Sequence, residues 1–172
     1  MIIAGAIPAI IALLIAIPLI TQTEIPFSAA GPNDVINIEF TKHDLKKVTF
    51  GVTDRIASQK SEILIVRDNG DVRYTVTDQG IPKPDILKKI GEDEVHRLTA
   101  LIKETGFMEI PSESFPVKDE ITEYQKSSLK ITLNGAVKQI NWPEQNATEK
   151  FVPPIITLVE SELNQIITKI SK

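Results

Sequence analysis

The chain has 172 residues, no cysteine and a formal net charge of −4, from 19 basic and 23 acidic side chains. The absence of cysteine excludes disulfide bonds, thiol catalysis and thiolate metal sites; it is typical of a prokaryotic envelope protein, although a cytosolic protein would show it too. A mildly acidic chain without a basic cluster argues against nucleic acid as the partner. The roughly 150 residues that follow the apolar N-terminus suffice for one domain.

Residues 1–20 carry no charged side chain and consist mainly of Ile, Ala and Leu. As a helix they would be roughly 28 Å long, close to the ~30 Å thickness of the hydrocarbon core of a bilayer. Pro8 and Pro18 would disrupt a soluble helix but are tolerated in membrane spans and export signals. We therefore expect this segment to be a transmembrane anchor or a signal.

Two interpretations of the segment remain open, a retained anchor and a cleaved signal. The small residues Ser28, Ala29 and Ala30 fit a cleavage site after Ala30, which would release a secreted protein. Against cleavage, the apolar run is longer than the usual ~7–15 residues of a signal core, and no Lys or Arg precedes it. We favour the anchor.

The charges that flank the segment indicate its orientation. The first basic residue after it is Lys42, and Glu24 and Asp34 come sooner. A flank without Lys or Arg is easier to translocate than to retain, so we expect the C-terminal domain outside the cytoplasm. Residues 21–34, which contain prolines and small residues, predict a linker to a globular domain of residues 35–172.

Two stretches near the start of the domain show the apolar–polar alternation of β-strands. Residues 35–40 predict a half-buried strand, and residues 47–53 predict a second one. The polar residues 41–44 between them predict a loop.

Two β-hairpins are predicted from Asn-Gly pairs between β-prone runs. Asn69-Gly70 lies at the centre of the first hairpin, residues 62–77, and Asn134-Gly135 follows a strand at residues 129–133. A type I′ turn fits both pairs, because both of its central residues need positive φ. Past the second turn the apolar side chains change parity, which predicts a bulge near Gln139.

Two helices are predicted. The acidic residues 92–94 begin the first, where the helix dipole favours negative charge, and Gly106 is its left-handed C-cap. Before it, residues 85–90 predict one helical turn. The second helix is capped by Thr148, has two prolines in its first turn, and carries an apolar stripe that could cover a sheet or bind a partner. The stripe consists of Ile155, Ile156, Val159, Leu163, Ile166, Ile167 and Ile170.

The succession of these elements predicts an α+β fold. We expect one mostly antiparallel sheet with both helices packed on one face, preceded by the transmembrane or signal helix. The other sheet face would carry Thr, Lys, Arg and Gln and meet water.

Few residues offer candidate chemistry. His43, in the predicted loop, and His96, on the first helix, lack the spacing of a zinc motif. No G-x-S-x-G elbow supports a serine triad, although triads assemble in space. Residues 92–94 are explained as a helix start, and Asp68 and Asp71 as turn residues, because no complete calcium loop follows them. We expect no catalytic residue, no cofactor and no metal site.

Two surface features are worth testing. Asn146-Ala147-Thr148 is a glycosylation tripeptide, so Asn146 would be an accessible acceptor if the domain is exported in a glycosylating organism. Residues 112–124 are polar and irregular, and they form either a recognition loop or an ordered cover of the sheet.

The layout of residues 63–170 resembles that of small prokaryotic envelope and inhibitor domains, among them the emfourin-like metalloprotease inhibitors. The resemblance comes from the hairpin at residues 69–74, the helix exit at residues 104–107, residues 118–120 before the strand at 129–133, and the closing apolar helix. It implies an α+β domain that binds a protease, but no inhibitory residue can be carried over.

Three functions follow as hypotheses. The first is a membrane-tethered, non-enzymatic domain outside the cytoplasm that binds a protein partner or supports an envelope complex. The second, implied by the resemblance, is a protease inhibitor. The third is an enzyme whose site is assembled in space, in which His43 or His96 would take part.

Overall fold

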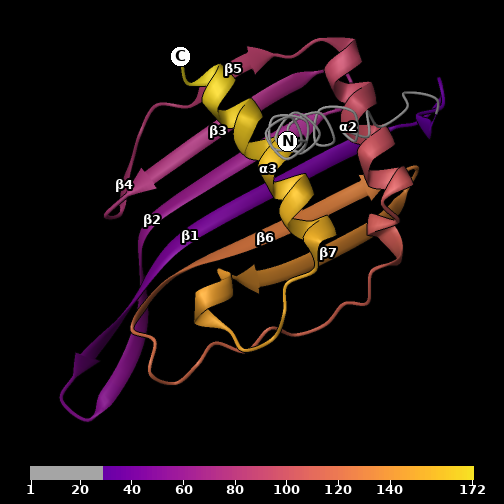
Figure 1. Ribbon diagram of the computed structural model, residues 1–172. Helices are drawn as coiled ribbons and strands as arrows, with labels where there is room; N and C mark the ends of the chain where they lie inside the picture. The colour runs from indigo at the N-terminus through magenta and orange to yellow at the C-terminus, as the bar shows by residue number, and fades with distance from the viewer. Residues whose placement is uncertain (1–28) are drawn as a thin grey trace, which may run out of the picture.

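The structure, a computed structural model, describes residues 29–172 and consists of an antiparallel sheet with two helices on one face (Figure 1). This confirms the predicted α+β class. The strands are β1 (Ile36–Phe50), β2 (Thr53–Arg67), β3 (Asp71–Asp78), β4 (Ile81–Pro82), β5 (Ile86–Lys89), β6 (Glu123–Leu133) and β7 (Ala136–Pro143). The helices are α2 (Glu92–Glu104) and α3 (Pro154–Ile170), with short 3₁₀ turns η3 (Phe107–Glu109) and η4 (Gln145–Ala147).

The predicted membrane segment, residues 1–20, and most of the predicted linker lie outside the described residues. Within residues 29–172 no helix is both long and apolar enough to cross a membrane. The described chain begins beside the sheet end at which β1 starts. There Asp34 accepts hydrogen bonds from Lys103 at 2.8 Å, from Asn134 at 2.7 Å and from the Gly31 backbone at 2.7 Å. These bonds hold the pKa of Asp34 at about 2, chiefly through Lys103.

The strand order across the sheet is β4-β3-β2-β1-β6-β7, and β5 also pairs with the outer side of β3. Every pair is antiparallel, so successive side chains of each strand alternate between a helix-covered face and an uncovered face. We call the uncovered one the open face. It carries Thr41, His43, Ile63, Ile65, Arg67, Arg73, Leu87, Ser128, Lys130 and Gln139.

The core lies between the sheet and the helices. Ile36, Ile38 and Phe40 of β1 are each 1% exposed, and each such burial stabilises the fold by about 1.5–3 kcal/mol. The predicted stripe of α3 is confirmed as the surface that covers the sheet. Ile156, Val159, Leu163, Ile166 and Ile170 are buried there, with Ile155 and Ile167 partly buried beside them.

The β1–β2 hairpin was not predicted, and the expected strand at residues 47–53 was wrong: β1 ends at Phe50, Gly51 and Val52 form the turn, and β2 begins at Thr53. Residues 41–44, expected to form a loop, are part of β1 and pair with β2 on one side and β6 on the other. The error arose because the apolar alternation of β1 stops at Phe40; the next side chain on that face, Lys42, is charged and bonds to Asn164 of α3. Main-chain pairing on both sides, rather than a hydrophobic face, keeps this part of the strand extended.

The segment 85–90, expected to be a helical turn, is an edge strand instead. β5 pairs with β3 from Ile86 to Lys89, and the Ile90 backbone N–H donates to the Gly70 carbonyl at 2.9 Å. A side chain at position 70 would place its Cβ 2.6 Å from the Ile90 carbonyl oxygen. Glycine at the hairpin turn is therefore needed for the close approach of β5 as well as for the turn.

The two Asn-Gly hairpins are confirmed, but only one has the predicted turn. Asn134 and Gly135 have φ of 51° and 84°, as a type I′ turn requires. At the first hairpin only Gly70 has positive φ, 81°, and its N–H donates to the Arg67 carbonyl at 2.9 Å. That combination describes a three-residue loop with a type I turn and a glycine bulge.

Two smaller expectations near the C-terminus were wrong. β6 and β7 pair without a register shift, so no bulge exists near Gln139; Val137 simply faces the open side and is 59% exposed. Thr148 does not cap α3, whose N-cap is Pro153. Its hydroxyl accepts the Lys150 N–H at 3.2 Å within the loop before the helix.

A polar network marks the end of the core beneath α3. The ammonium group of Lys42 lies 3.0 Å from the Glu62 carboxylate and donates to Asn164 of α3 at 3.1 Å. Burial alone would raise the pKa of Glu62, but hydrogen bonds from Lys60, Lys42 and Tyr74 outweigh it and hold that pKa at about 2. The network therefore connects three strands to α3 through one ionised carboxylate.

Candidate functional site

The most prominent surface feature is the far end of the β1–β2 hairpin, which projects beyond the rest of the sheet (Figure 1). β6 accompanies β1 only as far as Lys46, and β3 accompanies β2 only from Lys60 onward. We call residues 47–59 the arm. Two hydrogen bonds mark its base, from the Lys47 N–H to the Thr122 carbonyl and from the Gln79 N–H to the Gln59 carbonyl, both 2.7 Å.

The arm is built as a twisted two-stranded ribbon. The register of β1 and β2 shifts between Asp44 and Leu45, which is a bulge at its base, and a bulge bends a ribbon and increases its twist. At its end Gly51 has a φ of 64°, whereas Val52 does not have positive φ; a positive φ at only the first turn residue fits a type II′ hairpin. On one side Lys47 pairs with Asp54 at 2.8 Å.

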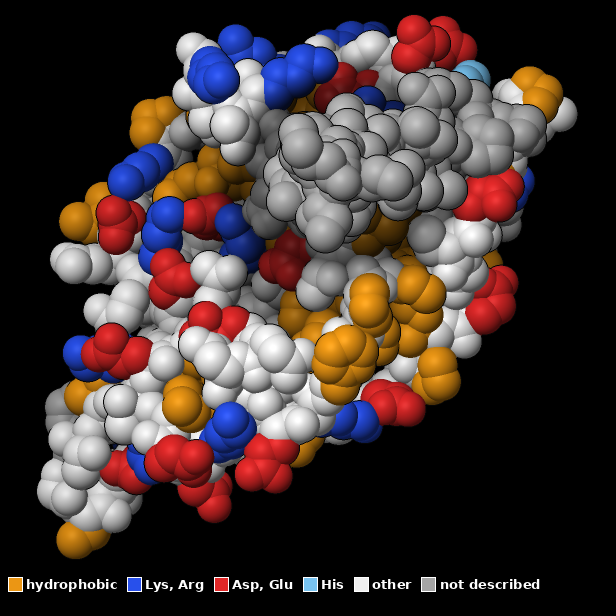
Figure 2. All heavy atoms as spheres, in the orientation of Figure 1, with side chains coloured by type: hydrophobic (Ala, Val, Ile, Leu, Met, Phe, Trp, Pro, Cys, Tyr) orange, Lys and Arg blue, Asp and Glu red, His pale blue; other side chains and the backbone are white. Residues whose placement is uncertain are grey.

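The arm exposes apolar side chains that contribute nothing to the core. Val52 at the turn is 102% exposed, and Ile56 is 62% exposed. Figure 2 shows a hydrophobic side chain at the very end of the arm, with charged and polar groups further along it. An apolar residue at the end of a ribbon adds no stability to the domain, so it is available for contact with another molecule.

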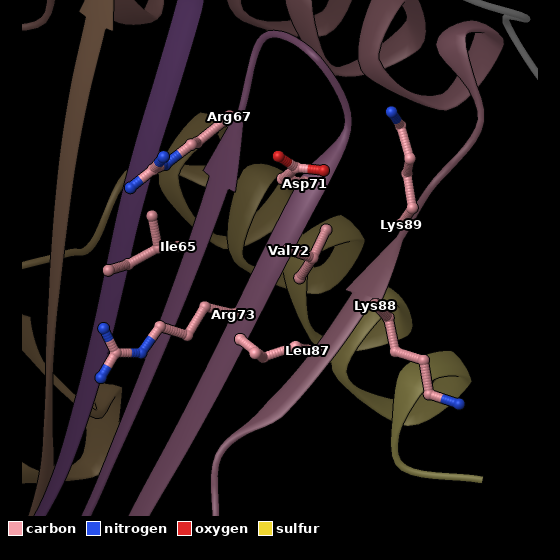
Figure 3. A pocket seen from close by; sticks show the side chains of 8 residues that line it. All are labelled: Ile65, Arg67, Asp71, Val72, Arg73, Leu87, Lys88 and Lys89. Carbon is pink, nitrogen blue, oxygen red and sulfur yellow. The ribbon is translucent and has the colours of Figure 1, made fainter.

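The second feature is a hollow of about 520 Å³ on the open face, over β2, β3 and β5 (Figure 3). Ile65 of β2 pairs with Arg73 of β3, which in turn pairs with Leu87 of β5. Arg67 lies two residues beyond Ile65 on the same face. Figure 3 shows the Arg67 and Arg73 side chains on either side of Ile65, extending in the same direction.

The cations around the hollow differ in how well they are neutralised. Arg73 pairs with Asp85 at 2.8 Å, and Asp85 also accepts a hydrogen bond from Thr75. Of the described acidic residues, none forms an ion pair with Arg67, Lys88 or Lys89. Leu87, although it lines the hollow, is 71% exposed. The hollow therefore combines uncovered apolar surface with unpaired positive charge.

The two histidines lie on opposite sides of the sheet. His43, in β1 rather than in a loop, faces the open side, and its Nδ1 lies 2.8 Å from the Ser61 hydroxyl. The adjacent Asp44 accepts a hydrogen bond from Gln125 instead of completing a triad with them. His96 is 42% exposed on α2, 3.9 Å from Glu92. Within residues 29–172 no group of His, Asp or Glu is placed to hold a metal ion.

The remaining candidate residues have structural partners. Glu94 of the acidic helix start pairs with Lys169 of α3 at 2.6 Å. Asn146, the glycosylation candidate, is exposed in η4. The loop predicted at residues 112–124 ends at residue 122, because β6 begins at Glu123. It is tied to η4 by a Lys118 N–H bond to the Ala147 carbonyl at 3.0 Å, and its Phe115 packs against the core. These contacts fit the interpretation of that loop as an ordered cover.

Sequence reasoning missed both surface features. The arm was hidden because residues 47–53 were predicted as one strand across its turn and residues 54–61 were assigned to no element. The hollow was hidden because β5 was expected to be helical. Arg67 and Arg73 could have been placed on the open face by parity with the buried Val66 and Val72.

Comparison with known protein families and with curated protein sequences finds no match to this chain.

Proposed function

We propose that this chain is a membrane-tethered, non-enzymatic domain that binds a protein partner outside the cytoplasm, with the arm as its contact surface. The observation that carries the proposal is the exposure of Val52 and Ile56 on a ribbon that the core does not support. Burying a valine or isoleucine side chain at an interface contributes about 1.5–3 kcal/mol. Two such side chains are enough to centre a small contact.

The position of the arm suits a tethered domain. β1 begins beside residues 29–35, where any preceding anchor is attached, and its 15 residues run to the turn at the end of the arm. At ~3.3 Å per residue the two ends of β1 are roughly 45 Å apart. With residues 1–20 in a membrane, the arm would extend away from the attached end of the domain, where a second protein could reach it.

Site-specific photocrosslinking of the full chain in its native membrane tests the proposal. A photoreactive residue at Val52 is compared with one at Phe151, which is 69% exposed elsewhere on the domain. We expect one defined protein adduct from position 52, absent from position 151 and lost when Ile56→Asp is added. The same adducts from both positions, or none from position 52, would contradict the proposal.

The emfourin-like inhibitor function remains the alternative, and one observation favours it. A protruding turn with extended backbone on both sides has the shape that enters a protease cleft. In that case the full chain would slow a metalloprotease of its own host, and Val52→Asp would relieve the inhibition. If no host metalloprotease is slowed, this alternative is removed while the tethered-partner proposal stands.

A further inference from the structure

We propose that the hollow over β2, β3 and β5 is a second recognition site, which takes an acidic, aliphatic segment of a protein. The segment would place an aliphatic side chain on Ile65 and Leu87 and a neighbouring carboxylate against Arg67. This site is separate from the arm, because Arg67 is the last residue of β2 and the arm contains the first residues of that strand.

The size and lining of the hollow fit a few residues of peptide. About 520 Å³ is within the ~300–1,000 Å³ range of ligand sites, which are lined mainly by apolar side chains with a few polar groups that fix orientation. Here Ile65 and Leu87 supply the apolar surface, and the guanidinium groups of Arg67 and Arg73 flank it (Figure 3). Because the hollow lies on an open sheet face, it suits side chains of an extended segment.

Charge complementarity indicates an acidic occupant. The chain as a whole is negative, at −4, yet three cations of the open face, Arg67, Arg73 and Lys89, line this hollow against one acid, Asp71. Asp71 is engaged in the turn, where its carboxylate accepts a hydrogen bond from Asn69 at 2.8 Å. Arg73 is neutralised by Asp85, which leaves the Arg67 guanidinium free to donate two hydrogen bonds to a carboxylate, the geometry that arginine favours.

Leu87 provides an independent argument for an occupant. An edge strand is normally protected by prolines and lysines, and β5 has both, in Pro84 before it and in Lys88 and Lys89 within it. Those residues explain the charge of the edge but not a leucine that is 71% exposed beside Arg73. An apolar side chain bound in the hollow would cover it.

The test uses the full chain in phosphatidylcholine nanodiscs and two peptide probes, acetyl-Glu-Leu-Glu-amide and acetyl-Gln-Leu-Gln-amide. Methyl NMR follows Ile65 and Leu87 during titration. We expect the Glu peptide to shift both methyl signals, the Gln peptide to bind several-fold more weakly, and added salt to reduce the difference. Equal binding of the two peptides, or shifts spread over other methyl groups, would overturn the proposal.

Matched variants separate this site from general surface charge. Arg67→Gln removes the unpaired guanidinium, and Lys130→Gln removes an exposed cation of the same face on β6. Leu87→Ser and Val137→Ser form the corresponding apolar pair, since both residues are exposed. Arg67→Gln and Leu87→Ser should each weaken binding of the Glu peptide several-fold. The two control variants should leave the affinity for that peptide unchanged. If the members of either pair behave alike, the hollow is not the site. Shifts induced by anionic phosphatidylglycerol in the discs, in place of the peptide, would also overturn it.

Discussion

Glu62 offers the sharpest test of how the sheet is fixed to α3. Its side chain is only 12% exposed, and its pKa of about 2 lies well below the ordinary value of 4.5. A lowering of this size corresponds to at most about 3 kcal/mol of stability at neutral pH. Glu62→Gln keeps the shape and one acceptor but leaves Lys42 and Lys60 without their carboxylate. We expect it to lower the free energy of unfolding at pH 7 by about 2 kcal/mol.

The pH dependence of this loss gives a second signature. Because the pKa is lowered in the folded state, the stabilisation is fully present above pH 4.5 and is lost as the pH falls from 4.5 to about 2. The wild-type chain should therefore approach the variant in stability over that window. Urea unfolding of the full chain in detergent measures this, with the fluorescence of Trp142, the single tryptophan, as the signal; its side chain is 3% exposed.

A matched control separates the buried network from ordinary surface pairing. Glu123 pairs with Lys46 at the surface and its side chain is 63% exposed, so Glu123→Gln should cost no more than about 1 kcal/mol. The reasoning is refuted if the two variants lose the same stability at pH 7. It is also refuted if the deficit of Glu62→Gln persists unchanged down to pH 2.

The same urea titration checks two further pairs of substitutions. Gly70→Ala should destabilise the domain by more than about 2 kcal/mol, because the Cβ of the new alanine would lie 2.6 Å from the Ile90 carbonyl oxygen and the backbone there has a φ of +81°. Gly51→Ala should cost about 1 kcal/mol, because position 51 has a φ of +64° but open space around it. On α3, Ile156→Ala should lower the free energy of unfolding by about 3–4 kcal/mol, since Ile156 is 0% exposed and its truncation leaves a cavity. Leu158→Ala should lower it by less than about 1 kcal/mol, because Leu158 is 43% exposed. Equal losses within either pair would contradict the packing described above.

The sequence predicted the elements in which local chemistry and burial agree. The alternation of Ile36, Ile38 and Phe40 marks a strand because one face meets the core, and the period of α3 marks a helix for the same reason. Asn134-Gly135 predicts a type I′ turn because both residues accept positive φ. In these places the pattern of side chains in the sequence is enough to predict the backbone conformation.

The remaining structure depends on pairing that side-chain periodicity does not report. Residues 41–44 stay extended because strands on both sides supply main-chain hydrogen bonds, although their own side chains are polar. β5 is fixed by β3 and by the close approach at Gly70, neither of which is visible in residues 85–90 alone. Both candidate surfaces follow from these non-local pairings; side-chain parity could have placed Arg67 and Arg73 on one face, but not the strands that border them.

The absence of cysteine makes one measurement decisive for the central claim, that the arm binds a protein partner outside the cytoplasm. Val52→Cys and Phe151→Cys are each labelled with a membrane-impermeant maleimide, in intact native cells and in the purified full chain. If the arm is outside and occupied, position 151 labels at the same rate in both samples, and position 52 labels several-fold more slowly in cells. If position 52 labels equally fast in both, no partner covers the arm; if neither position labels in intact cells, the domain lies inside.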